Sequence, residues 1–309
     1  MAQNTVAAQA GRKPPKRSQF SGMSKALVRR ETISAYLFLL PSLLFFVAFV
    51  VTPMCICLVY SLMEYSLGGI QGFAGLDNYI KLFQDPIFHK GFINTVIIVV
   101  VAVPCVTAFS LWVSSAIYKM HAIPRSFFRC VFYLPVVTGS VAITVVWKWI
   151  LHPYNGLLNQ LIGTKNFDWL GNPKTALWFI ILILFTTSIG QPIVLYVAAL
   201  GNVDQSLIEA AQVDGATKLQ VFWKIKWPQI MPTTLYVLVI TTINSFQCFA
   251  LIQLLTRGGP NNATMTIMYQ VYDTAYRLQD LGYANAIGVV LAIIIAIFSA
   301  IQFKLAKTE

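Results

Sequence analysis

The side chains that could hold a metal ion are few and far apart in this sequence. The three histidines, His89, His121 and His152, stand near the ends of three different apolar segments. Metal-binding histidines usually stand a few residues apart on one helix or loop, so we interpret these three as solvated loop residues. The five cysteines lie in or beside apolar segments, where Cys behaves as a small hydrophobic residue. The sequence therefore predicts no metal site.

The sequence also lacks the residue patterns that acid–base catalysis and phosphate binding require. All eleven acidic residues fall outside the middle of any long apolar segment, whereas ion-driven transporters commonly carry a carboxylate inside the membrane. No pair of carboxylates falls in a plausible pocket for acid–base catalysis, and the G-x-x-x-x-G-K-[ST] phosphate loop does not occur in the sequence. We therefore expect no catalytic residues and no bound cofactor, and we expect that the chain does not hydrolyse ATP itself.

A few uncharged polar side chains interrupt the apolar segments and could bind a polar solute. Asn244 and Gln247 stand three residues apart, so they share one face of a helix. Gln191 precedes Pro192, at a step that should loosen the helix, and Asn94 is the weakest candidate. Each of these residues could instead form a hydrogen bond between helices. The sequence leaves both interpretations open.

Membrane-spanning helices must position these side chains. The chain has 309 residues, of which 57% are hydrophobic and 11% charged, while about a quarter of the residues in a soluble domain are charged. A helix needs about 20 apolar residues to cross the bilayer, and six segments qualify: approximately 33–60, 92–118, 127–150, 176–200, 233–255 and 284–303. None of them alternates as barrel strands do. We predict an all-α integral membrane protein with six transmembrane helices over residues 31–309.

The distribution of basic residues predicts the orientation. Residues 1–30 contain seven Lys or Arg and no acid, which is typical of a disordered arm. Lys and Arg concentrate in cytoplasmic segments, and 15 of the 22 lie on one side if the N-terminus is cytoplasmic. The C-terminus and the loop at 203–232 are then cytoplasmic as well. The net charge of +11 suits anionic membrane lipid, and no basic face of a soluble domain indicates nucleic-acid binding.

The loop at 203–232 carries signals for two short helices. Two capping boxes begin them, formed by Ser206 with Glu209 and by Thr217 with Gln220. Gly215 suits the left-handed end of the first helix, and Pro228 is expected to end the second near Trp227. Helices this short need a surface to pack against. An amphipathic elbow lying on the lipid surface is the alternative interpretation.

The stretch EAAQVDGATKLQVFWKIKWPQIMP, from Glu209, resembles the EAA loop of permease subunits in binding-protein-dependent ABC importers. The matching residues are Glu209, Ala210, Ala211, Asp214, Gly215, Ala216, Phe222, Ile225, Pro228 and Pro232. Trp227 stands where leucine is usual and keeps an apolar contact. Segments beginning at Gly75 and Phe127, together with LTRGGPNNAT and LGYANAIG near the C-terminus, are similar to the carbohydrate branch of that family, the maltose-type and glycerol-3-phosphate-type permeases.

The resemblance implies a six-helix ABC importer permease fold with cytoplasmic coupling helices. It implies three partners in a bacterial cytoplasmic membrane: a second permease that forms a heterodimer, an ABC ATPase dimer that uses ATP and Mg²⁺, and an extracytoplasmic binding protein that delivers a sugar. By the same resemblance, Glu209 contacts the ATPase and Gly215 sets the elbow between the helices. Import of glycerol phosphate is the alternative within this class. A membrane-embedded enzyme and a passive channel are the alternatives from other classes.

Overall fold

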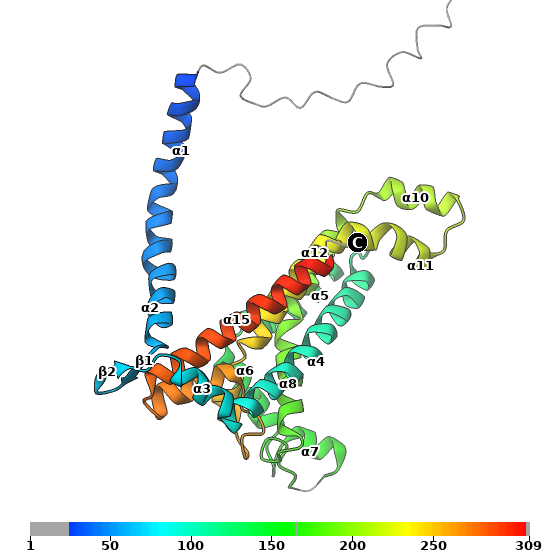
Figure 1. Cartoon of the computed structure of the whole chain (residues 1–309). Coiled ribbons are helices and arrows are strands. Elements are labelled where there is room, and N and C mark those ends of the chain that lie inside the picture. Colours follow the sequence, from blue (N-terminus) through cyan, green and yellow to red (C-terminus); the bar gives the residue numbers. More distant parts are fainter. Residues whose placement is uncertain (1–24, 165, 307–309) are drawn as a thin grey trace, which may run out of the picture. The chain divides into compact units, whose positions relative to one another are not determined.

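The computed structural model describes residues 25–164 and 166–306 and divides into two units, which are considered separately (Figure 1). The first unit, Met1–Ile56, holds α1 (Lys25–Phe46), the π-helical turn η1 (Val47–Val51) and the beginning of α2 (Thr52–Tyr60). The predicted disordered arm, residues 1–30, lies mostly outside the described residues. Its last part, residues 25–30, is helical in α1 because the helix begins before the apolar segment does.

The second unit, Cys57–Glu309, is mostly helical, as predicted. Its elements are β1 (Met63–Ser66), β2 (Gly69–Phe73), α3 (Asp77–Gln84), α4 (Pro86–Ile117), α5 (Ala122–Val137), α6 (Ser140–Ile150), α7 (Leu157–Ile162), α8 (Ala176–Ser188), α9 (Gly190–Gly201), α10 (Gln205–Val213), α11 (Lys218–Val221), η2 (Phe222–Lys226), α12 (Trp227–Phe246), α13 (Ala250–Leu255), α14 (Ile267–Tyr272), η3 (Asp273–Arg277) and α15 (Leu281–Ala306). The sequence did not predict the antiparallel hairpin of β1 and β2.

The described residues contain up to six candidate membrane spans, if each of two bent helix pairs counts as one span. Among the described residues, four helical stretches are long and apolar enough alone: Glu31–Tyr60, Pro86–Ile117, Lys218–Leu255 and Leu281–Lys304. The pair α8 and α9 bends by 41°, and the pair α5 and α6 by 98°. The segment predicted as a span at 127–150 is therefore divided into two helices and is not straight. The helix stops at Thr138 and Gly139, because both residues adopt extended backbone conformations.

Helices α4, α5 and α9 pack at close range through small residues. Ser110 of α4 donates a hydrogen bond to the carbonyl oxygen of Ile189 at 3.3 Å, and Ser114 donates to that of Ile193 at 3.0 Å. A Cβ atom added to Gly190 would lie 2.4 Å from the carbonyl oxygen of Phe132 in α5. Small residues let helix backbones approach closely in a membrane, so these contacts fix α9 against both neighbours.

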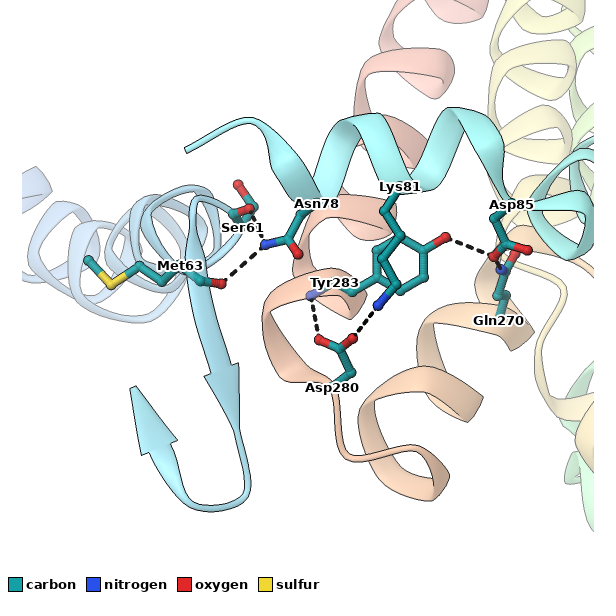
Figure 2. Close-up of polar contacts among 8 residues, drawn as sticks. All are labelled: Ser61, Met63, Asn78, Lys81, Asp85, Gln270, Asp280 and Tyr283. Atoms are coloured by element: carbon teal, nitrogen blue, oxygen red, sulfur yellow. Dashed lines mark hydrogen bonds and ion pairs between the residues drawn. The ribbon is translucent and has the colours of Figure 1, made fainter. Parts of the chain in front are cut away.

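A polar network fixes α3 and the start of α4 against α14 and α15 (Figure 2). Asp85 caps α4 by accepting a hydrogen bond from the Ile87 N–H at 2.8 Å. Its second oxygen accepts from the Gln270 amide and from the Tyr283 hydroxyl, each at 2.8 Å. A side chain that accepts three hydrogen bonds at once holds the junction of α3 and α4, α14 and α15 in one arrangement.

Candidate functional site

The loop at 203–232 folds into two short helices, but a different residue caps the first. Asp204 is the N-cap of α10, and one of its oxygens accepts hydrogen bonds from the N–H and the hydroxyl of Ser206, at 2.9 and 2.8 Å. Both hydrogen bonds lower the pKa of the Asp204 carboxyl, and the bond from the Ser206 hydroxyl has the larger effect. The predicted capping box of Ser206 with Glu209 is wrong, because the Asp204 carboxylate is the stronger acceptor and the Ser206 hydroxyl donates to it.

The elbow between the two helices agrees with the sequence. Gly215 has a φ of +80°, and two bonds close the end of α10: Ala216 N–H to the Ala211 carbonyl at 2.9 Å and Gly215 N–H to the Gln212 carbonyl at 3.1 Å. This pair is the Schellman arrangement that ends a helix at glycine. The capping box formed by residues 217 and 220 at the start of α11 is also confirmed.

Pro228 does not end the second helix, contrary to the prediction. Helix α11 continues through the π-helical turn η2 into α12, and the Trp227 N–H bonds to the Phe222 carbonyl, five residues back. A proline ring clashes with the carbonyl four residues before it and offers no N–H. The wide turn just before Pro228 relieves both problems. The same arrangement recurs in the first unit, where η1 precedes Pro53.

The loop residues that match the EAA pattern divide between two surfaces. Ala211, Ala216 and Ile225 pack on a hydrophobic cluster of the helix bundle that includes Ile208 and Val221. The exposed residues of the pattern are Glu209, Ala210, Asp214, Gly215, Pro228 and Pro232, and Phe222 is half-buried. Large apolar side chains accompany the exposed residues, because Val213 is 87% and Leu219 is 71% accessible. The loop therefore presents an ordered, partly apolar surface away from the bundle.

A cavity of about 310 Å³ lies where three helical segments are interrupted. These interruptions separate α5 from α6, α8 from α9, and α12 from α13. Gln191, Asn244 and Gln247, which were singled out from the sequence as solute-binding candidates, line this cavity together. No charged side chain is found among the described residues that line it. Irregular backbone inside a membrane protein is tolerated where it faces protein or a cavity, which fits this location.

Hydroxyl side chains complete the polar lining and were not identified from the sequence. They belong to Thr138, Ser140, Thr187, Ser188 and Thr241. A signal for them exists, because the stretches VTGS and TTS interrupt apolar segments with consecutive small polar residues. The hydroxyls of Thr138 and Thr187 donate to carbonyl oxygens of their own helices and can accept from a solute, while the amides can both donate and accept. The cavity is therefore suited to an uncharged solute with many hydroxyl groups.

Asn94 has a different environment. Its amide donates to the carbonyl oxygens of Asn262, Ala263 and Met265, at 3.4, 3.1 and 2.9 Å, and it does not line the cavity. These bonds hold the segment that leads into α14. The structure thus gives Asn94 a structural role, and a role in the solute pathway stays a prediction.

Apolar helices around a polar, uncharged cavity define a membrane transport subunit. The chain belongs to the family of binding-protein-dependent transport system inner membrane components, which matches it over residues 88–308. Its relatives are named as ABC transporter permeases, so it is a transport subunit of an integral membrane system and not an enzyme.

Three relatives and one solved structure extend this assignment. The chain is 34% identical to the probable ABC transporter permease protein YurN of Bacillus subtilis (strain 168), over 91% of this chain and 99% of that protein. It is 29% identical to a probable starch degradation products transport system permease protein, AmyD of Thermoanaerobacterium thermosulfurigenes, covering 92% and 97%. It is also 29% identical to the sn-glycerol-3-phosphate transport system permease protein UgpA of Escherichia coli (strain UTI89 / UPEC), covering 89% and 94%.

The fold is that of a solved importer. A bacterial ABC transporter involved in the import of the acidic polysaccharide alginate superposes with a TM-score of 0.77 at 23% identity, covering 92% of this chain and 98% of that one. The likeness agrees with the predicted ABC importer permease fold.

Proposed function

We propose that this chain is the permease subunit of an ATP-driven importer for a sugar or oligosaccharide. The observation that carries the proposal is the cavity of about 310 Å³, whose described polar lining consists of amides and hydroxyls without charge. Hydroxyl-rich solutes need many neutral hydrogen-bond partners, and specificity in a pocket comes from a few such groups. Gln191, Asn244 and Gln247 are the residues proposed to bind the solute. The names of relatives that transport starch degradation products support the same solute class.

The energy is proposed to come from a separate ABC ATPase dimer that docks on α10 and α11 and uses ATP and Mg²⁺. The exposed part of the loop offers Glu209 and Asp214 beside the apolar Val213 and Leu219. An exposed apolar surface with a polar rim is typical of a protein interface. The surface would otherwise lie on lipid, but its exposed charges are mixed, with Glu209 and Asp214 beside Lys218 and Lys224, and give no net attraction to anionic lipid.

The remaining partners follow from the family. A second permease, forming a heterodimer, and an extracytoplasmic solute-binding protein complete the proposed complex. The distribution of basic residues supports a bacterial cytoplasmic membrane location with both chain termini in the cytoplasm. In this orientation α10 and α11 face the ATPase, and the segment between α13 and α15 faces the binding protein.

Glycerol phosphate is the second candidate solute, because UgpA is a relative of similar coverage. A phosphate ester carries charge and usually binds to Arg, Lys or a helix N-terminus. Lys148, near the outer end of the predicted third span, is exposed on α6, and neither it nor Arg129, the other basic residue of that span, lines the cavity. The lining therefore favours a neutral sugar.

Reconstitution tests the transport proposal. Vesicles that contain this chain, the second permease and the ATPase would receive sugar-loaded binding protein outside and ATP inside, and labelled sugar would be counted inside. We expect uptake that requires ATP. Uptake without ATP would indicate a passive channel, and no uptake of any sugar would refute the proposal.

Docking is tested by co-purification with the Glu209→Lys variant. We expect the ATPase to be lost from this variant while the second permease is retained. Glu64→Lys is the matched control, because Glu64 is equally exposed but lies on β1, far from the loop in the sequence. If equal amounts of the ATPase co-purify with wild type and with Glu209→Lys, Glu209 does not contribute to docking of the ATPase.

A further inference from the structure

Three aromatic rings form a continuous row from the polar cavity to the protein surface. The ring of Phe249 lies 4.9 Å from that of Tyr272, and the ring of Tyr272 lies 5.1 Å from that of Tyr276, measured between centroids. Tyr276, at the outer end, is 72% exposed. Tyr269 supports the row from behind, stacked at 6.3 Å from Phe249 and only 1% exposed. The row therefore has a half-buried end at Phe249 and an accessible end at Tyr276.

The backbone of α14 and η3 presents the tyrosines on one face. Tyr269, Tyr272 and Tyr276 follow each other at spacings of three and four residues, which align side chains along a helix. Thr266 caps α14 by accepting from the Tyr269 N–H at 3.3 Å. Thr95 of α4 accepts from the Ile267 N–H at 3.1 Å, which attaches the start of α14 to the bundle. The rings are thus mounted on a fixed element.

Two hollows meet at Phe249. This residue lines the cavity of about 310 Å³ that contains Asn244 and Gln247. It also lines a second hollow of about 410 Å³, whose wall includes Tyr272, Tyr276 and the amide-bearing Asn285. Phe249 is therefore a wall shared by the two hollows, with the tyrosines on one side of it and the amides on the other. The surface end of the row lies between the fifth and sixth spans, on the side that is extracytoplasmic in the proposed orientation.

We propose that the row of Phe249, Tyr272 and Tyr276 is a stacking site for pyranose rings that guides an incoming saccharide to the cavity. This inference rests on the proposed sugar-import function. One face of a pyranose ring presents C–H groups, which pack on the face of an aromatic ring, while a hydroxyl at its edge can donate to the amide oxygen of Asn285, whose amide nitrogen already donates to the Leu281 carbonyl. Successive rings stand at a spacing comparable to one sugar unit, so the site should favour chains over single sugars.

The alternative is a purely structural role for Tyr276, as part of the aromatic belt that anchors membrane proteins at the lipid–water boundary. A belt residue contributes to anchoring in lipid and has no reason to change the affinity for a dissolved saccharide. Binding measurements on a folded complex therefore separate the two explanations.

The test uses the complete complex of both permeases and the ATPase in lipid nanodiscs, without the binding protein, so that sugar can bind only to the membrane complex. Maltotriose, cellotriose, xylotriose and glucose are titrated separately, and binding is followed by saturation-transfer NMR of the sugar C–H protons. We expect Tyr276→Leu and Tyr272→Leu to raise the Kd for the bound trisaccharide by about threefold to tenfold, with a smaller effect for glucose. Tyr276→Phe keeps the ring and should bind as wild type does.

Tyr236→Leu is the matched control, because Tyr236 is an exposed tyrosine of α12 that lines neither hollow. Unchanged trisaccharide affinity in both leucine variants would overturn the stacking site, even if vesicles still import the sugar. Equal losses in Tyr236→Leu would also overturn it, because the effect would then not belong to the row. If the wild-type complex binds no saccharide and vesicles import none, the proposed function fails together with this inference.

Discussion

Replacing Gly190 by alanine should separate α9 from α5. The new Cβ atom would lie 2.4 Å from the Phe132 carbonyl oxygen, 2.8 Å from Val136 Cγ2 and 3.0 Å from Tyr133 Cα. Nonbonded carbon atoms prefer about 3.5–4.0 Å, so the two helices must move apart by about 1 Å. Two of the three close atoms belong to the backbone and cannot rotate away. Adding a methyl group to a packed interior costs about 1–3 kcal/mol, and we expect the upper half of that range.

The assay is thermal unfolding of the purified complex, followed by the loss of the folded peak in size-exclusion chromatography. A loss of this size corresponds to a fall in Tm of roughly 4–6 °C for a domain of this length. Gly201→Ala is the control on the same helix, because nothing lies within 4 Å of its added Cβ atom. Gly190→Ala with the Tm of wild type would refute the close packing of α5 and α9.

Three further predictions concern the loop and the polar network. Residue 215 has a φ of +80°, so Gly215→Val should strain the elbow by about 1–2 kcal/mol or more and reduce the amount of ATPase that co-purifies. Asparagine tolerates this backbone conformation, so Gly215→Asn should retain the ATPase. Equal ATPase recovery with both variants would contradict the strain. Asp85→Ala should lower the free energy of unfolding by about 3 kcal/mol, because a helix cap and two hydrogen bonds to a carboxylate are lost. Denaturant titration measures this change, and an unchanged unfolding midpoint would contradict the role of Asp85. The bonds to Ser206 lower the pKa of Asp204, so this carboxylate caps α10 fully above its ordinary pKa of 3.8, and the cap is lost as the pH falls through the lowered pKa. Amide hydrogen exchange in α10 should therefore become faster at low pH in wild type than in Asp204→Asn, whose side chain cannot titrate. Identical pH profiles in the two proteins would contradict this role of Asp204.

The sequence predicted those features that depend on local composition. Apolar length located the spans, and Gly215 located the elbow because few other residues adopt a positive φ at no cost. Asn244 and Gln247 share a helix face and do line one cavity. That Gln191 joins them could not be predicted, because the meeting depends on how α9 packs against α12 and not on any local pattern.

Other features resulted from competition between neighbours. Ser206 has the sequence signature of a cap, yet Asp204 two residues earlier takes that position. Pro228 reads as a helix stop, yet one wide turn accommodates it. The 98° bend after Val137 leaves the apolar composition of its segment unchanged, so hydropathy could not reveal it. In each case the local signal is real, but a second group decides the outcome.

The uninterrupted path from α11 through η2 into α12 makes the exposed loop and one wall of the cavity parts of a single rod. Lys218 begins this rod and Phe246 ends it, and at about 1.5 Å per residue Asn244 lies about 40 Å from Lys218 along the axis. Helical backbone, with no flexible linker, connects the two ends, so a displacement of α11 is carried directly into α12. We therefore expect a force that displaces α11 to move Asn244 relative to Gln191, which lies on the separate helix α9, and to change the width of the cavity between them.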